Sequence, residues 1–181
     1  MDEWARLENE CDLKRSPEVR ILSPPLKTNM RDKNVLISKA VVYRKKGDKK
    51  EWFVVRESQN SEWEIAKTNV RKGESSVRAA IRMLAEEGAM RGKVLEEAGR
   101  AGGAASINGD VVPVRYLYYL MVQKGESGEA LGFSETEWLE YARAVRKLAN
   151  KRDRQMLSSA RKVMRELEKK RKKKAKSGGV A

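Results

Sequence analysis

Arg82, Glu86 and Glu87 are the residues of this 181-residue chain whose types and spacing could do chemistry. They lie in the stretch AAIRMLAEEG (79–88), where two carboxylates follow an arginine by four and five positions. Side chains three or four apart on a helix share a face, and carboxylates are ligands that Mg²⁺ prefers. Beside the arginine stands Met83, whose neutral thioether is a poor ligand for hard cations. The stretch therefore predicts either a metal site or a metal site that has lost a ligand.

Two residue types that often carry catalysis are scarce or missing in this chain. It contains no histidine, which excludes histidine bases, nucleophiles and metal ligands from within the sequence. Its single cysteine, Cys11, excludes a disulfide framework and a thiolate zinc cluster. Any metal must therefore be held by oxygen atoms, which indicates Mg²⁺, Mn²⁺ or Ca²⁺.

The chain is strongly basic, with 40 lysines and arginines, 26 acidic residues and a net charge of +14. Half of this charge lies in the run KKRKKKAK (169–176), which contains no acid. The basic residues of the run are Lys169, Lys170, Arg171, Lys172, Lys173, Lys174 and Lys176. Such a run predicts binding to a polyanion such as RNA or a ribonucleoprotein. The alternative is a solvated tail that only keeps the protein in solution.

The first half of the chain predicts three strands and a helix. β-branched and aromatic residues indicate strands at 35–44, 51–58 and 63–67. A loop over 68–76 then leads to a helix that Ser75 or Ser76 can cap and Gly88 ends. At about 100° per residue, the apolar stripe of Val77, Ala80, Ile81 and Leu84 lies opposite Met83, Glu86 and Glu87. The helix is therefore expected to bury the stripe and expose Met83 between the two glutamates.

The second half predicts a strand and two helices. A Gly/Ala-rich loop at 96–111 separates two strand pieces, and 114–122 is the strongest strand. Ser134 and Glu137 form a capping box that opens a helix to about Asn150. The last helix is expected at about 152–174. Its apolar stripe consists of Met156, Leu157, Ala160, Val163, Met164 and Leu167.

This element order predicts an α+β fold, or an α/β/α sandwich around a mixed sheet, with a C-terminal helix that ends in a basic tail. The expected organisation is an N-terminal extension (1–33), one domain (34–167) and the basic tail (168–181). No apolar run is long enough to span a bilayer, and the N-terminus lacks the pattern of a signal peptide. The expected location is therefore the cytoplasm.

The segment WEIAKTNVRKGESSVRAAIRMLAEEG (63–88) resembles the signature of the Nudix hydrolase family, G-x5-E-x7-R-E-U-x-E-E-x-G-U, in which U is a bulky aliphatic residue. Glu74, Arg82 and the Glu86–Glu87 pair match their positions, and Leu84 and Met90 match the two U positions. Three residues depart from the pattern. Thr68 replaces the first glycine, Met83 replaces the glutamate after the arginine, and Ala89 takes the place of the last glycine. The segment 137–160 resembles the closing part of the dinucleoside polyphosphate hydrolase branch, so the likeness covers roughly residues 35–165.

The resemblance implies a function for these residues. Nudix enzymes cleave a diphosphate linked to another group with the help of Mg²⁺ or Mn²⁺, which neutralises the phosphates and activates the attacking water. It implies that Glu86 and Glu87, with Glu74, serve the metal and catalysis, and that Arg82 orients the loop through Glu74. Met83 would occupy the place of a metal ligand or base. Loss of a general base alone typically lowers a rate by about 10²–10⁴-fold.

Two hypotheses follow. In the first, the chain is a degenerate Nudix-fold protein that binds RNA, a ribonucleoprotein or a nucleotide diphosphate with weak or absent hydrolysis. Its tyrosines at 116, 118 and 119 would stack on bases or pack in the core. In the second, it is an active Mg²⁺-dependent hydrolase of dinucleoside polyphosphates or capped RNA. A downstream acid (Glu126, Glu129, Glu135 or Glu137) would then replace the missing carboxylate.

Overall fold

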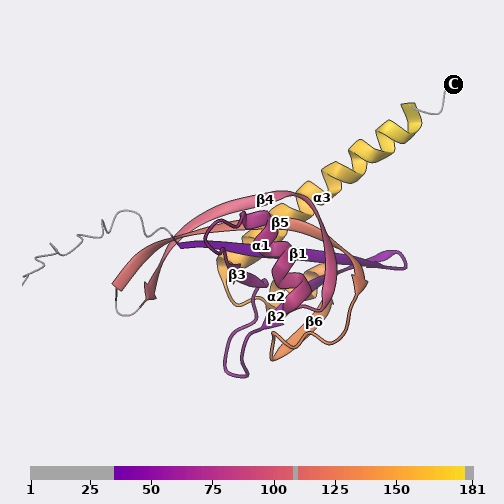
Figure 1. Cartoon of the computed structure of the whole chain (residues 1–181). Coiled ribbons are helices and arrows are strands. Elements are labelled where there is room, and N and C mark those ends of the chain that lie inside the picture. Colours follow the sequence, from indigo (N-terminus) through magenta and orange to yellow (C-terminus); the bar gives the residue numbers. More distant parts are fainter. Residues whose placement is uncertain (1–34, 108–109, 178–181) are drawn as a thin grey trace, which may run out of the picture. The chain divides into compact units, whose positions relative to one another are not determined.

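The computed structural model describes residues 35–107 and 110–177, which form six strands and three helices (Figure 1). The first strands are β1 (Val35–Lys46), β2 (Lys49–Arg56) and β3 (Lys67–Asn69), followed by helix α1 (Ser76–Glu86). The chain continues with β4 (Met90–Ile107), β5 (Asp110–Glu126) and β6 (Glu135–Glu140). Two helices, α2 (Tyr141–Lys147) and α3 (Lys151–Ser177), follow. The expected α+β fold with a C-terminal helix is confirmed, whereas the predicted extension at 1–33 lies outside the described residues.

All six strands belong to one mixed sheet, with the order β4-β5-β1-β2-β6. β1 is central and runs parallel to β5, from Val35 opposite Val114 to Tyr43 opposite Val122. On its other side the first half of β1 pairs with β3 and the second half with β2, both antiparallel. Apolar runs such as AVVY (40–43) suit this central position because both faces of the strand are covered.

Helices cover both faces of the sheet, and each face has its own apolar cluster. On one face the buried cluster joins Val41, Trp52 and Tyr118 to residues of α2 and α3. On the other face it joins Val42, Phe53 and Met121 to residues of α1. Alternate residues along β1 and β2 therefore serve opposite layers, as the two-residue period of a strand requires. The predicted α/β/α sandwich is confirmed.

The predicted Gly/Ala-rich loop at 96–111 is wrong, because most of this segment is a long antiparallel hairpin. β4 and β5 pair from Met90 opposite Glu126 to Ile107 opposite Asp110. The register shifts near Gly92, Glu96 and Gly99, and such shifts bend a strand without ending it. Glycines indicated a loop in the sequence, but the continuous partner strand holds them in the sheet.

The helix predicted from the Ser134–Glu137 capping box is also wrong at its start. Residues 135–140 form β6, which pairs with β2 from Arg56 opposite Glu135 to Glu51 opposite Glu140. The helix begins only at Tyr141. A strand partner for the edge of β2 thus prevails over a local helix signal.

The last helix agrees with the prediction and is slightly longer. In α3, Leu157, Ala160 and Met164 are buried, and Met156, Val163 and Leu167 pack against the same cluster. Beyond Glu168 the side chains at 169–174 are exposed. The predicted stripe is therefore the face that α3 lays on the sheet, and the basic run occupies its last turns (Figure 1).

Candidate functional site: the box helix

The loop before α1 is fixed by an ion pair with two hydrogen bonds between Glu74 and Arg82. Arg82 donates from Nε to Glu74 Oε1 at 2.9 Å and from Nη2 to Glu74 Oε2 at 3.1 Å. Nη2 also donates to the carbonyl of Asn69 at 3.2 Å, next to the end of β3. Two-point pairing of a guanidinium with a carboxylate is among the stronger charge-assisted contacts. Arg82 therefore ties the loop and β3 to the helix, as the resemblance implied.

The charge of Glu74 is strongly stabilised by its partners. Arg82, followed by the backbone N–H of Arg71, lowers the pKa of Glu74 from its usual range to about 2. The same loop provides the helix cap, since Ser75 Oγ accepts from the N–H of Arg78. Of the two serines predicted as caps, Ser75 is the one used. The Glu74 carboxylate is thus engaged in structure, with both oxygens already accepting hydrogen bonds.

Met83 does not lie on the exposed face where the helical wheel placed it. Its side chain is fully buried, together with Ala79, Ala80 and Leu84. Ile81, predicted for the buried stripe, is 42% exposed. The helix is therefore rotated, so that alanines and Met83 face the sheet. Small side chains let a helix approach a sheet closely, and a flexible methionine fills the remaining gap.

The side chain of Met83 belongs to an apolar cluster, where the family signature has a carboxylate. The cluster includes Leu84, Met90, Met121 and Phe133. A charged group in such surroundings would be costly unless it were paired. At this position of the signature, the chain therefore has a side chain that packs in the core.

The two glutamates of the signature have different surroundings. Glu86 is half exposed and pairs with Arg82 at 3.3 Å and Arg71 at 3.6 Å. Glu87 is partly buried, and burial raises the pKa of its carboxyl. The nearby charges of Glu57 and Glu86 raise this pKa further. The N–H of Gly132 donates to the Glu87 carbonyl at 3.1 Å, so the loop after β5 packs over the end of α1.

Gly132 is required at this contact by space. A Cβ atom at position 132 would lie 2.3 Å from the Cβ of Glu87, a distance that no side chain allows. The backbone of the loop therefore approaches the helix end as closely as it does only because residue 132 has no side chain.

Glu57 is a residue that the sequence analysis missed. It follows β2, and its carboxylate lies 3.4 Å from the ammonium group of Lys67. Burial is the main cause of the raised pKa of Glu87, and the charge of Glu57 raises it further. Glu57 lies outside the family signature, and no motif around it in the sequence indicates a functional residue. The structure thus brings a third acid toward the predicted pair.

The possible ligands on α1 and in the loop before it do not fit Mg²⁺, the metal that the family implies. In the described part of the chain, no group of three or more acidic, cysteine or histidine side chains is arranged to hold a metal ion. Mg²⁺ needs several oxygen ligands in a regular octahedron. Glu74 and Glu86 instead bind arginines, and a buried thioether occupies the place of the missing carboxylate.

The downstream acids proposed as replacements are engaged elsewhere. Glu126 pairs with Arg44, Glu135 with Arg56 and Glu137 with Lys147. Glu129 is exposed in the loop after β5. Three of the four candidates therefore have ion-pair partners of their own.

The two displaced glycines of the signature have different consequences. Ala89, at the position of the last glycine, has φ of +45°, in the left-handed region that favours glycine. Thr68 lies in β3 opposite Ser38 and is an ordinary strand residue. Backbone strain is therefore found at Ala89 and not at Thr68.

A buried ion pair between the sheet and α3 was also not foreseen. Lys39 of β1 is 4% exposed and Asp153 of α3 is fully buried. The ammonium group lies 2.9 and 2.8 Å from the two carboxylate oxygens of Asp153. Asp153 also accepts from the hydroxyl of Tyr118 at 2.8 Å and the N–H of Ile65 at 3.2 Å.

The tyrosines proposed for base stacking pack in the core. Tyr118 is fully buried and Tyr119 is 6% exposed, with its hydroxyl 2.7 Å from Ser76 Oγ. Tyr116 lies beneath the guanidinium of Arg152 at 5.3 Å. Stacking by Tyr118 and Tyr119 is therefore ruled out by burial, and their alternative core role is confirmed.

The α/β/α sandwich and the Glu74–Arg82 ion pair, which ties the loop before α1 to that helix, define a Nudix-type fold. The NUDIX domain model matches residues 36–160, and the chain belongs to the Nudix family. A search of curated proteins finds no significant match.

Similar solved structures show the same fold at low sequence identity. An Ap4A hydrolase of C. elegans has a TM-score of 0.55 at 19% identity, covering 72% of this chain and 98% of the other. The NUDIX domain of Shewanella oneidensis NrtR, complexed with ADP ribose, has a TM-score of 0.59 at 16% identity, with coverage of 72% and 88%. The E. coli dihydroneopterin triphosphate pyrophosphohydrolase has a TM-score of 0.53 at 12% identity, with coverage of 67% and 91%.

No helix within residues 35–107 and 110–177 combines the length and apolar character needed to cross a membrane.

Proposed function

We propose that this chain is a degenerate Nudix-fold protein that binds RNA or a ribonucleoprotein and has weak or absent pyrophosphohydrolase activity. The observation that carries the proposal is Met83, fully buried in an apolar cluster at the position of an expected carboxylate. The Glu74–Arg82 pair persists because it holds the loop, a structural role that needs no catalysis. The fold is thus retained while the donor set is not.

Charge supports RNA as the partner. The chain carries +14, and the residues at 169–173 in α3 are exposed along a helix. Lysines along a helix contact phosphates with little sequence preference and strong dependence on salt. A nucleotide diphosphate is a second ligand class, supported by the ADP ribose complex of the similar NrtR domain. A cytoplasmic location remains part of this proposal.

Binding is tested with a labelled single-stranded RNA and two forms of the protein, the full chain and a chain ending at Glu168. The full chain is expected to bind with a steep salt dependence, and the shortened chain more weakly and with a flatter slope. Equal binding by both forms would remove the basic tail from the proposal.

Hydrolysis is tested by incubating the full chain with dinucleoside polyphosphates, sugar nucleotides and capped RNA in the presence of Mg²⁺ or Mn²⁺. The expected result is turnover no greater than that of the Glu87→Gln variant. Turnover that Glu87→Gln abolishes would overturn the proposal and establish the alternative, an active metal-dependent hydrolase. One observation favours this alternative, namely that burial, and to a smaller extent the nearby charges of Glu57 and Glu86, raise the pKa of the Glu87 carboxyl.

A further inference from the structure

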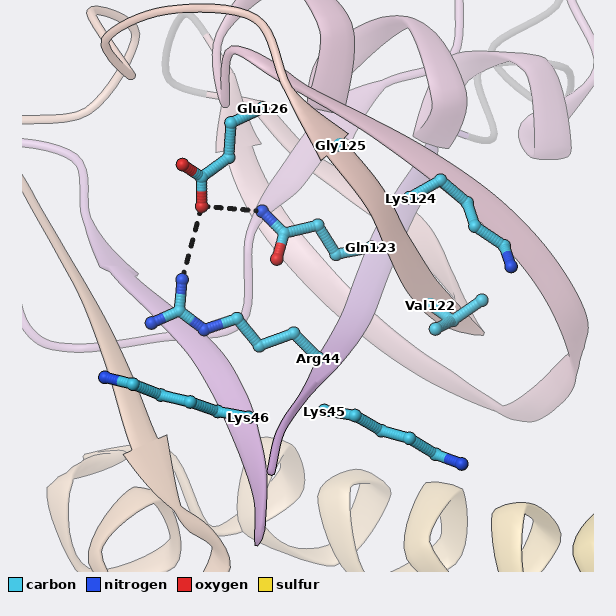
Figure 2. A pocket seen from close by; sticks show the side chains of 8 residues that line it. All are labelled: Arg44, Lys45, Lys46, Val122, Gln123, Lys124, Gly125 and Glu126. Carbon is cyan, nitrogen blue, oxygen red and sulfur yellow. Dashed lines mark hydrogen bonds and ion pairs between the residues drawn. The ribbon is translucent and has the colours of Figure 1, made fainter. Parts of the chain in front are cut away.

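An open basic groove lies where the β1–β2 hairpin forms one end of the sheet, and no residue of α1 lines it. Pairing between the parallel strands β1 and β5 ends at Tyr43 opposite Val122. Beyond this point β1 continues with β2, and β5 continues with β4. A hollow of about 680 Å³ lies there, lined by Arg44, Lys45 and Lys46 on one side and 122–126 on the other (Figure 2).

A second hollow continues the first toward α3. It measures about 690 Å³ and shares Lys45, Val122 and Lys124 with the first. Its other wall includes Arg171 and Lys172 of α3, and Lys93 of β4 also lines it. We call the two hollows together the hairpin groove. The basic end of α3 is thus one wall of a groove whose remainder is built by the sheet.

The hairpin groove is strongly cationic. Eight lysines and arginines line it, against three acids. Two of the acids are neutralised within the protein, because Glu126 pairs with Arg44 at 3.3 Å and Glu168 with Lys50 at 2.7 Å. Figure 2 shows Arg44 and Gln123 directed at Glu126, while the ammonium groups of Lys45, Lys46 and Lys124 point away from it.

Six of these cations remain available to a ligand. Among the residues that the structure describes, none of them takes part in an ion pair. They are Lys45, Lys46, Lys93, Lys124, Arg171 and Lys172. They come from β1, β4, β5 and α3, four elements that only the fold brings together. Like charges gathered in this way repel one another, and an anionic ligand relieves that repulsion.

We propose that the hairpin groove binds the phosphodiester backbone of a single-stranded nucleic acid, with the last turns of α3 extending the same track. This inference rests on the proposed function and assigns it a surface. A cationic groove that follows a backbone is the arrangement used for single strands. Since α3 rises about 1.5 Å per residue, its five residues beyond Lys172 lengthen the track by roughly 7.5 Å.

The groove offers charge without a platform for bases. Of the described residues that line it, Tyr43 is the one aromatic, and it is 4% exposed. Base stacking is therefore absent from the contact, and phosphate contacts carry little sequence information. Oligomers of uridine and of adenosine should bind with similar affinity.

The test compares two variants of the full chain that remove the same charge. The groove variant carries Lys45→Gln, Lys93→Gln and Lys124→Gln, all at exposed positions. The control variant carries Lys72→Gln, Arg78→Gln and Lys151→Gln, which are exposed but line neither hollow. Circular dichroism and melting temperatures confirm that both variants are folded. Binding of a labelled 20-nucleotide RNA, and of DNA of the same sequence, is then measured against salt concentration.

The groove variant is expected to flatten the slope of log affinity against log salt by about 2, because each lost contact to a single strand contributes about 0.7. The control variant should keep the slope of the unmodified chain. Similar affinity for RNA and DNA indicates that phosphates alone are read, whereas preference for RNA adds a contact to the 2′-hydroxyl. Both results support the proposal.

Other outcomes overturn it, and they separate it from the proposed function. If the groove variant binds like the control while removal of 169–181 abolishes binding, the inference fails and the tail alone binds RNA. If the unmodified chain binds no nucleic acid, the proposed function fails. If groove-dependent binding occurs only to vesicles containing phosphatidylserine, the partner is a membrane surface and the inference is wrong.

Discussion

Met83 stands where the family signature has a carboxylate, and its side chain is fully buried. Restoring the carboxylate of the signature with Met83→Glu would place an acid in a cluster with Leu84, Met121 and Phe133. The free energy of unfolding is expected to fall by more than about 3 kcal/mol, because a buried carboxyl without a partner is among the costliest substitutions. Urea denaturation followed by tryptophan fluorescence measures this.

A matched control for Met83 is available. Met83→Leu conserves the apolar volume and should change the free energy of unfolding by less than about 1.5 kcal/mol. A Met83→Glu variant that kept its stability and gained metal-dependent hydrolysis would contradict the burial and point to an inactivated ancestral enzyme.

Ala89 carries backbone strain that a single substitution can relieve. Its φ of +45° costs about 1–2 kcal/mol for a residue with a Cβ. Ala89→Gly should therefore stabilise the protein, although the added freedom of the unfolded chain takes back about 0.4–1 kcal/mol. The same change at Ala85, an exposed residue inside α1, should instead destabilise by about 1 kcal/mol. Thermal unfolding of the two variants side by side would show opposite signs, and a loss of stability in Ala89→Gly would contradict the strain.

At the scale of the element, the loop before α1 should respond to acid through Glu74. Its pKa in the folded protein, about 2, lies below that of an ordinary glutamate. The pair therefore contributes its full stability at neutral pH. That contribution is lost as pH falls from the usual glutamate range toward 2. A carboxyl NMR titration should give Glu74 the lowest midpoint of the box glutamates, and Glu74→Gln should remove this part of the acid sensitivity. A midpoint near 4 would mean that the pair is open in solution.

The attachment of α3 to the sheet depends on the buried pair of Lys39 and Asp153. Asp153→Ala leaves the buried ammonium group of Lys39 with only the more distant carboxylate of Glu64, 3.5 Å away, so a loss of about 3 kcal/mol in the free energy of unfolding is expected. Adding Lys39→Met should recover part of this loss, because the uncompensated charge is then removed. A double-mutant cycle by chemical denaturation measures the coupling, and strictly additive effects would show that the pair is not formed.

The sequence predicted where most helices and strands lie better than it predicted which of them pair or pack together. Runs of β-branched residues marked β1 and β2, and the stripe ending at Leu167 marked α3, because these signals are local. The helix predicted from the capping box at Ser134 was wrong at its start, because β6 depends on pairing with β2, which is far away in the sequence. The predicted orientation of α1 was wrong for a related reason. A helical wheel favours burial of the more hydrophobic Ile81 over Ala79, whereas close packing on a sheet favours the smaller residue.

The candidate site shows the same limit. The signature spacing identified Glu74 and Arg82 as partners because both lie in one short segment. Glu57, Asp153 and the hairpin groove were not found, because each depends on residues from distant elements. The positive charge of α3 was visible in the sequence, but the cationic walls supplied by β1, β4 and β5 were not.

The central position of β1 also has a consequence for synthesis on the ribosome. This strand is made well before its parallel partner β5, which begins at Asp110, and Lys39 meets Asp153 across 114 residues of sequence. Contacts between such distant segments slow folding, because the intervening chain must first be brought together. The edge of β1 that pairs with β5 therefore stays unpaired until β5 has been translated, although β2 and β3 can pair with the other edge earlier. Chaperones that recognise exposed apolar segments would have their longest opportunity to bind at residues 35–46.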